Sequence, residues 1–105
     1  MHSSFYKTAR WKRMRAAILS RDGYRDQVAA RYGKNIEANT VHHILPRESY
    51  PEYKLKSWNL ISVSHETHNR LHDRATGALT AEGKDLADRT ARRHGIKLKD
   101  GSDNH

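Results

Sequence analysis

The sequence contains no cysteine, no long apolar run and no internal repeat. Without cysteine the chain forms no disulfide, which is compatible with a reducing cytoplasm. No segment approaches the ~20 apolar residues that a membrane-spanning helix needs, and the N-terminus lacks the apolar core of a signal peptide. We therefore expect a soluble, cytoplasmic protein that has no membrane partner.

Apolar residues are scarce throughout: they make up 35% of the 105 residues, whereas 30% are charged. A chain of this length forms one small domain with a thin core. We expect this domain to span residues 1–96 and a disordered tail to span residues 97–105, where apolar residues are few. The large side chains expected in or near the core are Trp11, Trp58, Tyr24, Tyr32 and Phe5.

Positive charge is in excess, because twenty Lys and Arg residues face twelve Asp and Glu, for a formal net charge of +8. Such an excess favours a polyanionic partner such as DNA or RNA, since binding releases counterions. A basic surface can also serve only to keep a small protein soluble. Charge alone therefore leaves nucleic-acid binding open.

Hydrophobic spacing and capping residues predict a mixture of helices and strands. The N-terminal helix has Trp11, Met14 and Ile18 at helical spacing, and Asp22 and Gly23 end it. Ser64 and Thr80 can each cap the start of a later helix. The patterns predict helices over residues 8–20, 25–32, 64–74 and 80–93, and strands over residues 40–46 and 58–63.

Histidines lie in the first predicted strand and in the predicted helix that follows the second strand. His42 and His43 are neighbours in a predicted strand, so their side chains point to opposite faces, and one can bind a metal while the other activates water. His68 and His72 are four residues apart in a predicted helix, the spacing at which one helix face presents two imidazoles to a cation. Each histidine taken singly can equally be a hydrogen-bonded structural residue.

The string over residues 41–46, followed by Asn59 and by residues 68–72, resembles the signature of the HNH endonucleases, also called His-Me finger or ββα-metal nucleases. Residues 5–7, 10–11 and 21–24 resemble the lead-in of small phage and prophage members. The resemblance implies an α+β fold: a small ββα-metal core with an N-terminal helix packed on it and a further C-terminal helix.

The resemblance also implies roles for individual residues. His42, His68 and His72 correspond to metal ligands and His43 to the general base, while Asn59 corresponds to the catalytic-site asparagine that holds the loop between the strands. With no carboxylate among these ligands, Zn²⁺, Ni²⁺, Co²⁺ or Mn²⁺ should bind better than Mg²⁺. The basic residues near the motif that we expect to bind flanking phosphates are Arg47, Lys54 and Arg70.

One departure from the family pattern concerns the two Cys-x-x-Cys pairs that hold a structural zinc in many relatives. Asp26, Ala29, Ser64 and Thr67 stand at the corresponding positions. We therefore expect no structural zinc and a fold held by packing of the N-terminal helix on the ββα unit. The side chains expected at that contact are Trp11, Ile18, Leu19, Trp58, Leu60 and Ile61.

The expected function is metal-dependent hydrolysis of phosphodiester bonds in double-stranded DNA. Resemblance to small phage members implies genome packaging or end processing in a bacterial host cell, with the large subunit of the phage terminase as an expected partner. Two alternatives stay open: a catalytically silent DNA-binding module on an HNH scaffold, and an interaction domain in which the histidines hold a structural zinc. An intact His43 disfavours the silent module, and an open fourth metal position would favour catalysis.

Overall fold

The computed structural model describes residues 2–99, without the side chains of residues 2 and 3. The helices are α1 (His2–Lys7), α2 (Ala9–Arg21), α3 (Gln27–Ala30), α4 (His65–Leu71) and α5 (Ala81–Arg93), and the strands are β1 (Thr40–His43) and β2 (Leu60–Val63). Short 3-10 helices, Pro51–Tyr53 and Ser57–Asn59, lie between the strands. None of the helices within the described range is long and apolar enough to span a bilayer. Of the expected tail, residues 100–105 lie outside the described residues, whereas Leu98 packs on the core.

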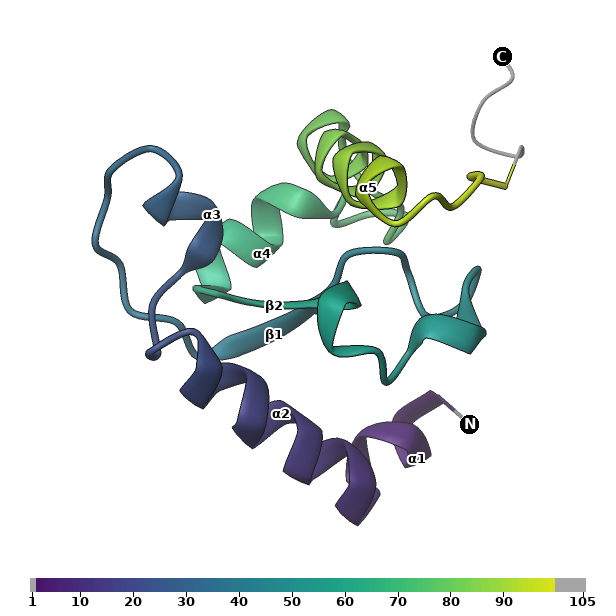
Figure 1. The fold of residues 1–105 in the computed structure, drawn as a ribbon, viewed down its shortest axis with the longest axis horizontal. Helices are drawn as coiled ribbons and strands as arrows, with labels where there is room; N and C mark the ends of the chain where they lie inside the picture. Colours follow the sequence, from purple (N-terminus) through teal and green to yellow (C-terminus); the bar gives the residue numbers. More distant parts are fainter. Residues whose placement is uncertain (1, 100–105) are drawn as a thin grey trace.

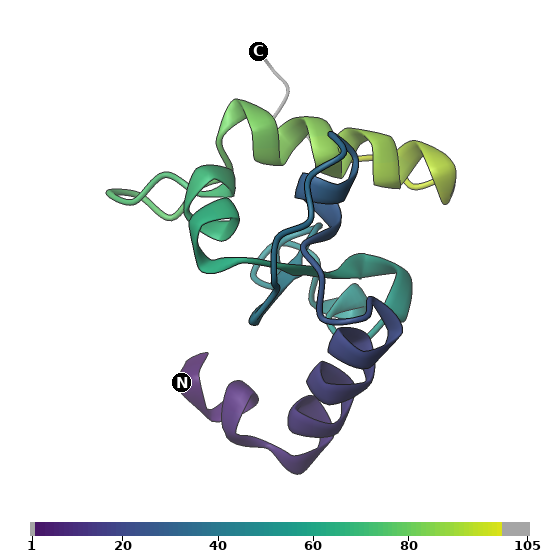
Figure 2. The same cartoon turned by 90° about the vertical axis from the view of Figure 1, so that its left-hand side faces the viewer.

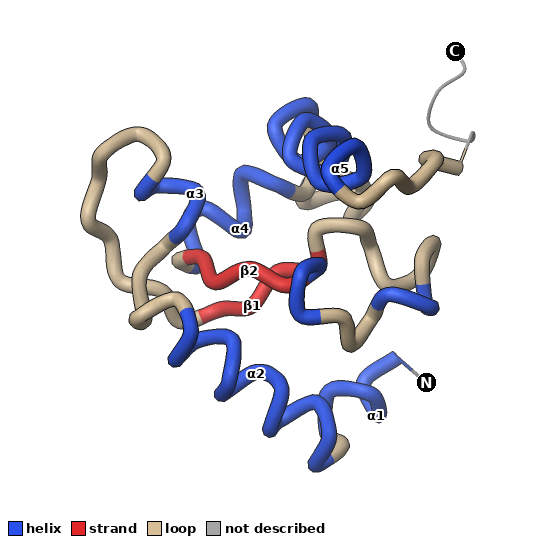
Figure 3. The backbone as a smooth tube through the Cα atoms, in the orientation of Figure 1, coloured by secondary structure: helices blue, strands red, loops and turns tan. Residues whose placement is uncertain are grey.

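The two strands form an antiparallel sheet with α2 on one side and α4 and α5 on the other (Figures 1 and 3). His43 pairs with Leu60 and His42 pairs with Ile61. Paired residues share a face, so His43 and Leu60 face α2, whereas His42 and Ile61 face α4. The α+β architecture expected from the sequence, with an N-terminal helix on a ββα core and a last helix beyond it, is confirmed.

Each face of the sheet has its own apolar cluster. The cluster under α2 contains Trp11, Ile18, Leu19, Ala38, Val41 and Leu60. The cluster on the α4 and α5 side contains Val28, Ile44, Leu45, Tyr50, Val63, Leu71, Leu86 and Ala87. The thin core is thus divided into two layers, and the sheet is the wall between them.

Several core expectations were wrong. Trp58 and Ile61 pack on the α4 and α5 side and not against α2, because Ile61 alternates with Leu60 and Trp58 stacks on His94 at 4.3 Å between ring centroids. Tyr24 and Tyr32 are 53% and 72% exposed, since both lie in the turns that flank α3. Tyr50, from the loop between the strands, is the tyrosine that the core buries.

The helix starts predicted at Thr8, Ser64 and Thr80 are confirmed, and each depends on a local hydrogen bond, whereas the helix predicted over residues 25–32 spans only Gln27–Ala30. Thr8, Ser64 and Thr80 each accept a hydrogen bond from the backbone N–H three residues later. Gly83, one turn into α5, lies where an added β-carbon would collide with the Leu71 carbonyl oxygen. Glycine therefore allows α5 to approach the end of α4 closely.

The predicted end of α4 was wrong: the helix stops at Leu71, and residues 72–74 lie outside it. His72 is extended, with φ −127° and ψ 140°, and forms an isolated bridge with Leu79. The last carbonyls of α4 are used by Thr80, whose hydroxyl donates to Arg70 and whose N–H donates to Leu71. A turn over residues 73–78 then returns the chain to α5, as Figure 2 shows.

A buried carboxylate joins the segments that would hold zinc in relatives with cysteine pairs. Asp26 is fully buried and accepts hydrogen bonds from Ala29 N–H at 2.9 Å and Ser64 N–H at 2.8 Å. Ser64 and Thr67 are also hydrogen-bonded to each other, at 3.1 Å. The four residues predicted to replace the cysteines therefore meet in space, and Asp26 caps α3 while it holds the start of α4.

The outer edge of β2 is closed by the same stretch of chain. Asp22 accepts the Ser62 N–H at 3.0 Å, and Arg21 donates to the Leu60 carbonyl at 2.8 Å. These hydrogen bonds use the backbone groups that a further strand would need for pairing with β2.

The buried Asp26 carboxylate has a lowered pKa. Burial by itself would raise this pKa, but hydrogen bonds from Thr67, Ala29 and Ser64 outweigh burial and hold the pKa below its ordinary value.

We expect Asp26→Asn to lower the free energy of unfolding by about 2 kcal/mol at neutral pH, because a buried N–H loses its acceptor. The carboxylate has a depressed pKa in the folded state, so its contribution is present above the unfolded value of about 3.9 and is lost as pH falls through the folded value. Urea unfolding followed by circular dichroism over a pH series measures the difference. Asp88→Asn on α5 is the control, and a loss that does not shrink on acidification contradicts the assignment.

Candidate metal centre and catalytic cleft

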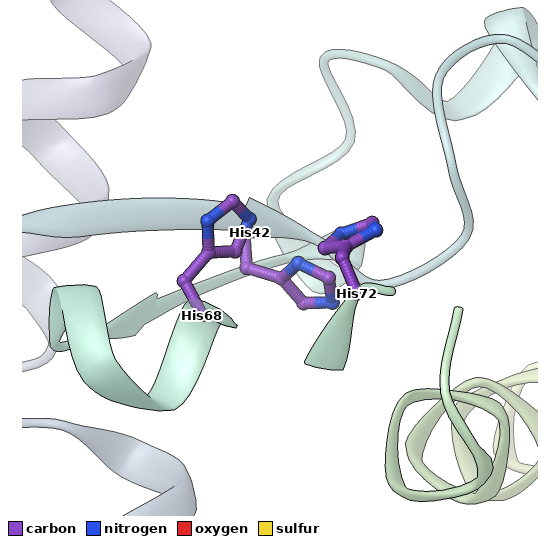
Figure 4. Close-up of side chains that lie close together, drawn as sticks. All are labelled: His42, His68 and His72. Atoms are coloured by element: carbon purple, nitrogen blue, oxygen red, sulfur yellow. The ribbon is translucent and has the colours of Figure 1, made fainter. Parts of the chain in front are cut away.

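Three histidines converge on the α4 side of the sheet. His42 comes from β1, His68 from α4 and His72 from the residue that follows α4 (Figure 4). One ring nitrogen from each lies within 4.8 Å of the others, and the ring centroids are 5.0 to 5.2 Å apart. Side chains from a strand and from a helix meet here because β1 and α4 pack face to face.

The buried imidazole of His42 has neither ring nitrogen hydrogen-bonded within the described structure. The residue is 1% exposed, so bulk solvent does not reach these atoms, and a buried polar atom without a partner is costly. Burial lowers the pKa of His42 well below its ordinary value, and the nearby His68 and His72 lower it further. Burial and His72 likewise lower the pKa of His68. Neutral imidazoles with free lone pairs fit a divalent metal ion.

His72 reaches this cluster by a different route from the predicted one. We expected α4 to carry it on the same face as His68, but its backbone has already left the helix. Its Nδ1–H donates to the Gly77 carbonyl at 3.0 Å, and because a carbonyl only accepts, this bond fixes the tautomer. Nε2 is left as the nitrogen with a free lone pair.

His43 lies on the opposite face of β1, against α2. Its Nε2–H donates to the Lys54 carbonyl at 3.0 Å, which leaves Nδ1 able to accept a proton. The Trp11 ring stacks on it, with centroids 5.2 Å apart and planes at 20°. Burial lowers the pKa of His43, the hydrogen bond to Lys54 opposes this, and the positive charge of Arg47 lowers it again. A neutral, oriented imidazole results.

Asn59 holds the loop between the strands. It is fully buried; its side-chain oxygen accepts the Leu45 N–H at 2.7 Å, and its amide donates to the Leu45 and Tyr53 carbonyls at 3.1 and 3.2 Å. The residue after Tyr53 is Lys54, whose carbonyl orients His43. Asn59 thus lies behind the cleft and acts on His43 through the loop.

An open cleft of about 680 Å³ runs past the histidines. One side comes from the N-terminal helices, the floor from β1 and the residues after it, and the other side from α4 and the 73–78 turn. Its wall residues include Tyr6, Trp11, Arg15, His43, Arg47, His68 and His72. Sequence analysis did not find Arg15, although its position four residues after Trp11 places both on one helix face.

The three predicted phosphate-binding residues have different surroundings. Arg47 lines the cleft, and its guanidinium lies 4.6 Å from the Phe5 ring centroid and 5.1 Å from that of Tyr6. Lys54 extends over Phe5 at 5.5 Å and is not a wall residue. Arg70 turns toward α5, where it pairs with Glu82 at 3.7 Å. Of the three, the structure brings only Arg47 into the cleft.

Comparison with known proteins gives one informative match. No family model matches the sequence, and no curated protein matches it significantly. Among solved structures, the chain is similar to the HNH endonuclease of the deep-sea thermophilic bacteriophage GVE2, crystallised with a manganese ion, with a TM-score of 0.64 and 30% sequence identity. The alignment covers 90% of this chain and 86% of that one. On this identity and coverage, together with the histidine cluster, the chain belongs to the HNH endonuclease family.

Proposed function

We propose that the protein is a metal-dependent endonuclease that hydrolyses phosphodiester bonds in double-stranded DNA. The observation that carries the proposal is the convergence of the buried His42 with His68 and His72, which line an open cleft. Among the side chains that the structure describes, those of residues 4–99, no fourth joins this group, and three protein ligands with an open position are typical of catalytic metal sites. The cleft also contains His43 and Arg47, a base and a phosphate-binding cation.

His43 takes the proton from the attacking water at its Nδ1, because Nε2 is occupied by the Lys54 carbonyl. Trp11 and the loop held by Asn59 keep the ring in place during this transfer. Arg47 binds a phosphate oxygen through its guanidinium. A divalent ion held by His42, His68 and His72 would stabilise negative charge on the phosphate and on the departing 3′ oxygen.

Three neutral imidazoles favour Zn²⁺, Ni²⁺, Co²⁺ or Mn²⁺ over Mg²⁺, because nitrogen ligands suit these ions better. The manganese ion in the crystal of the phage endonuclease supports Mn²⁺ as the first ion to test. The phage source of that enzyme also supports a role in phage genome packaging or end processing. The terminase partner rests on this likeness alone, since nothing in residues 2–99 identifies a surface for it.

We expect His43→Ala to lower cleavage of supercoiled plasmid by at least about 100-fold, because general-base catalysis contributes this much or more. Mn²⁺ affinity, measured by calorimetry, should be unchanged, since His43 is not among the proposed ligands. His65→Ala, at an exposed histidine in the first turn of α4, is the matched control. If His43→Ala loses Mn²⁺ and His42→Ala retains it, the roles of metal ligand and general base are reversed between the two residues. If the wild-type protein binds DNA but is as inactive as His43→Ala, the silent DNA-binding module is favoured.

Binding of duplex DNA should weaken by about 100-fold between about 50 and about 200 mM salt, which corresponds to about four phosphate contacts. The measurement uses the His43→Ala protein and fluorescence anisotropy with two unrelated duplexes, which should bind alike. Arg15→Ala and Arg47→Ala should each reduce the slope of affinity against salt by about one contact. Arg89→Ala, whose side chain pairs with Asp85 on α5, serves as control. A flat slope or a strong preference for one duplex would count against the proposal.

A chelator should abolish cleavage and leave most of the helical circular dichroism unchanged, because the Asp26 hydrogen bonds and the two apolar clusters do not involve the ion. The thermal midpoint should fall, since an ion that binds only the folded state adds stability, about 2.7 kcal/mol at a concentration 100 times its Kd. Global unfolding on chelation would instead identify the ion as the main stabiliser of the fold.

A further inference from the structure

The third metal ligand of the proposed centre has the least support from regular secondary structure. His42 is fixed within β1 and His68 within α4, whereas His72 is half-buried and lies beyond the helix. A side chain on a chain segment outside regular secondary structure has more conformational freedom to lose on metal binding. Some other part of the fold must therefore hold this imidazole in place.

The turn over residues 73–78 provides that support through hydrogen bonds. The Asp73 carboxylate accepts the N–H groups of Ala75 at 2.8 Å and Thr76 at 3.1 Å. The Asp73 backbone closes the turn, because its N–H donates to Ala78 and its carbonyl accepts from Gly77, both at 2.7 Å. All six residues of the turn are exposed, so hydrogen bonds and not packing determine its shape.

Gly77 connects this turn to the metal ligand. Its φ is +78°, a conformation that residues with a β-carbon adopt only with strain, and an added β-carbon would meet no atom within 4 Å. Glycine is thus required for backbone conformation and not for space. In this conformation the Gly77 carbonyl accepts the Nδ1–H of His72 at 3.0 Å.

We propose that Asp73 and Gly77 are positioning residues for the metal ligand His72. Asp73 shapes the turn, the turn places the Gly77 carbonyl, and that carbonyl fixes the tautomer and ring orientation that leave Nε2 for the ion. Metal affinity thus depends on a turn that supplies no ligand itself. This inference rests on the proposed metal centre, and it adds two residues that the family signature does not include.

The test is calorimetric titration of the metal-free full-length chain with Mn²⁺. Asp73→Ala and Gly77→Ala should each weaken binding by about 10-fold or more, as loss of an outer hydrogen-bond partner does at other metal sites. Asp73→Asn removes the same charge but keeps the acceptor oxygen, so it should bind within about threefold of wild type. Arg74→Ala, in the same turn, should match wild type. Equal losses in Asp73→Asn and Asp73→Ala would show a charge effect and overturn the inference.

A double-mutant cycle separates positioning from a general effect on the fold. In a His72→Ala background, Asp73→Ala should cause no further loss of Mn²⁺ affinity, because the ligand on which it acts is absent. The same loss in both backgrounds overturns the inference. Helical circular dichroism accompanies each variant, and the two Asp73 variants carry the test if Gly77→Ala does not fold. If wild type binds Mn²⁺ and Asp73→Ala binds equally well, only this inference fails; if wild type does not bind, the proposed metal centre fails too.

Discussion

The buried carboxylate of Asp26 is the interaction on which the rest of the structure depends. It caps α3 and accepts the N–H of Ser64, the residue that starts α4, so it sets where the helix that carries His68 leaves the sheet. Asp22, one turn of chain earlier, binds the outer edge of β2. A domain this small has little apolar surface to bury, and charge-assisted hydrogen bonds in its interior supply the missing restraint. Four residues, none of which has a thiol, thus stand where cysteines hold zinc in many relatives, and they join the same two segments by hydrogen bonds.

The two-fold alternation of a strand separates the two imidazoles to which we assign different chemical tasks. Adjacent side chains of β1 enter different layers: His42 meets the histidines of the α4 side, and His43 meets Trp11 of α2. Each layer then adjusts its imidazole. Burial keeps both rings neutral, but only His43 has a carbonyl that orients it, whereas neither nitrogen of His42 is hydrogen-bonded, so either one can offer the lone pair of the neutral ring to a metal ion. A sheet of two short strands is enough to place the two imidazoles on opposite faces, because His42 and His43 are adjacent residues of one strand.

The cleft is assembled from segments that are distant in the sequence. Aromatic residues of α1 hold Arg47 beside His43, α2 adds Arg15, and the turn after α4 closes the other side. The positions of the basic side chains are therefore more informative than the net charge of the chain. Arg70, for example, forms an ion pair with Glu82 and lies away from the cleft. A polyanion that enters the cleft meets Arg15 and Arg47 next to the proposed base, which is the arrangement phosphodiester cleavage requires.

The sequence by itself determined the features that depend on near neighbours. Three helix caps, the opposite faces of His42 and His43, and the family signature all follow from residues within a few positions of one another. The tertiary structure alone decided which large side chains are buried, where α4 ends and which basic residue enters the cleft. Tyr24 and Tyr32 are apolar enough for a core but lie in exposed turns. His72 lies outside α4 because Thr80 hydrogen-bonds to the last carbonyls of that helix and the 73–78 turn uses the backbone groups of the residues that follow. Helical spacing can predict that two histidines share a face, but not that the chain turns before the second one. Side-chain burial and the end of α4 depend on contacts between segments that are distant in the sequence, and a local sequence pattern does not predict these contacts.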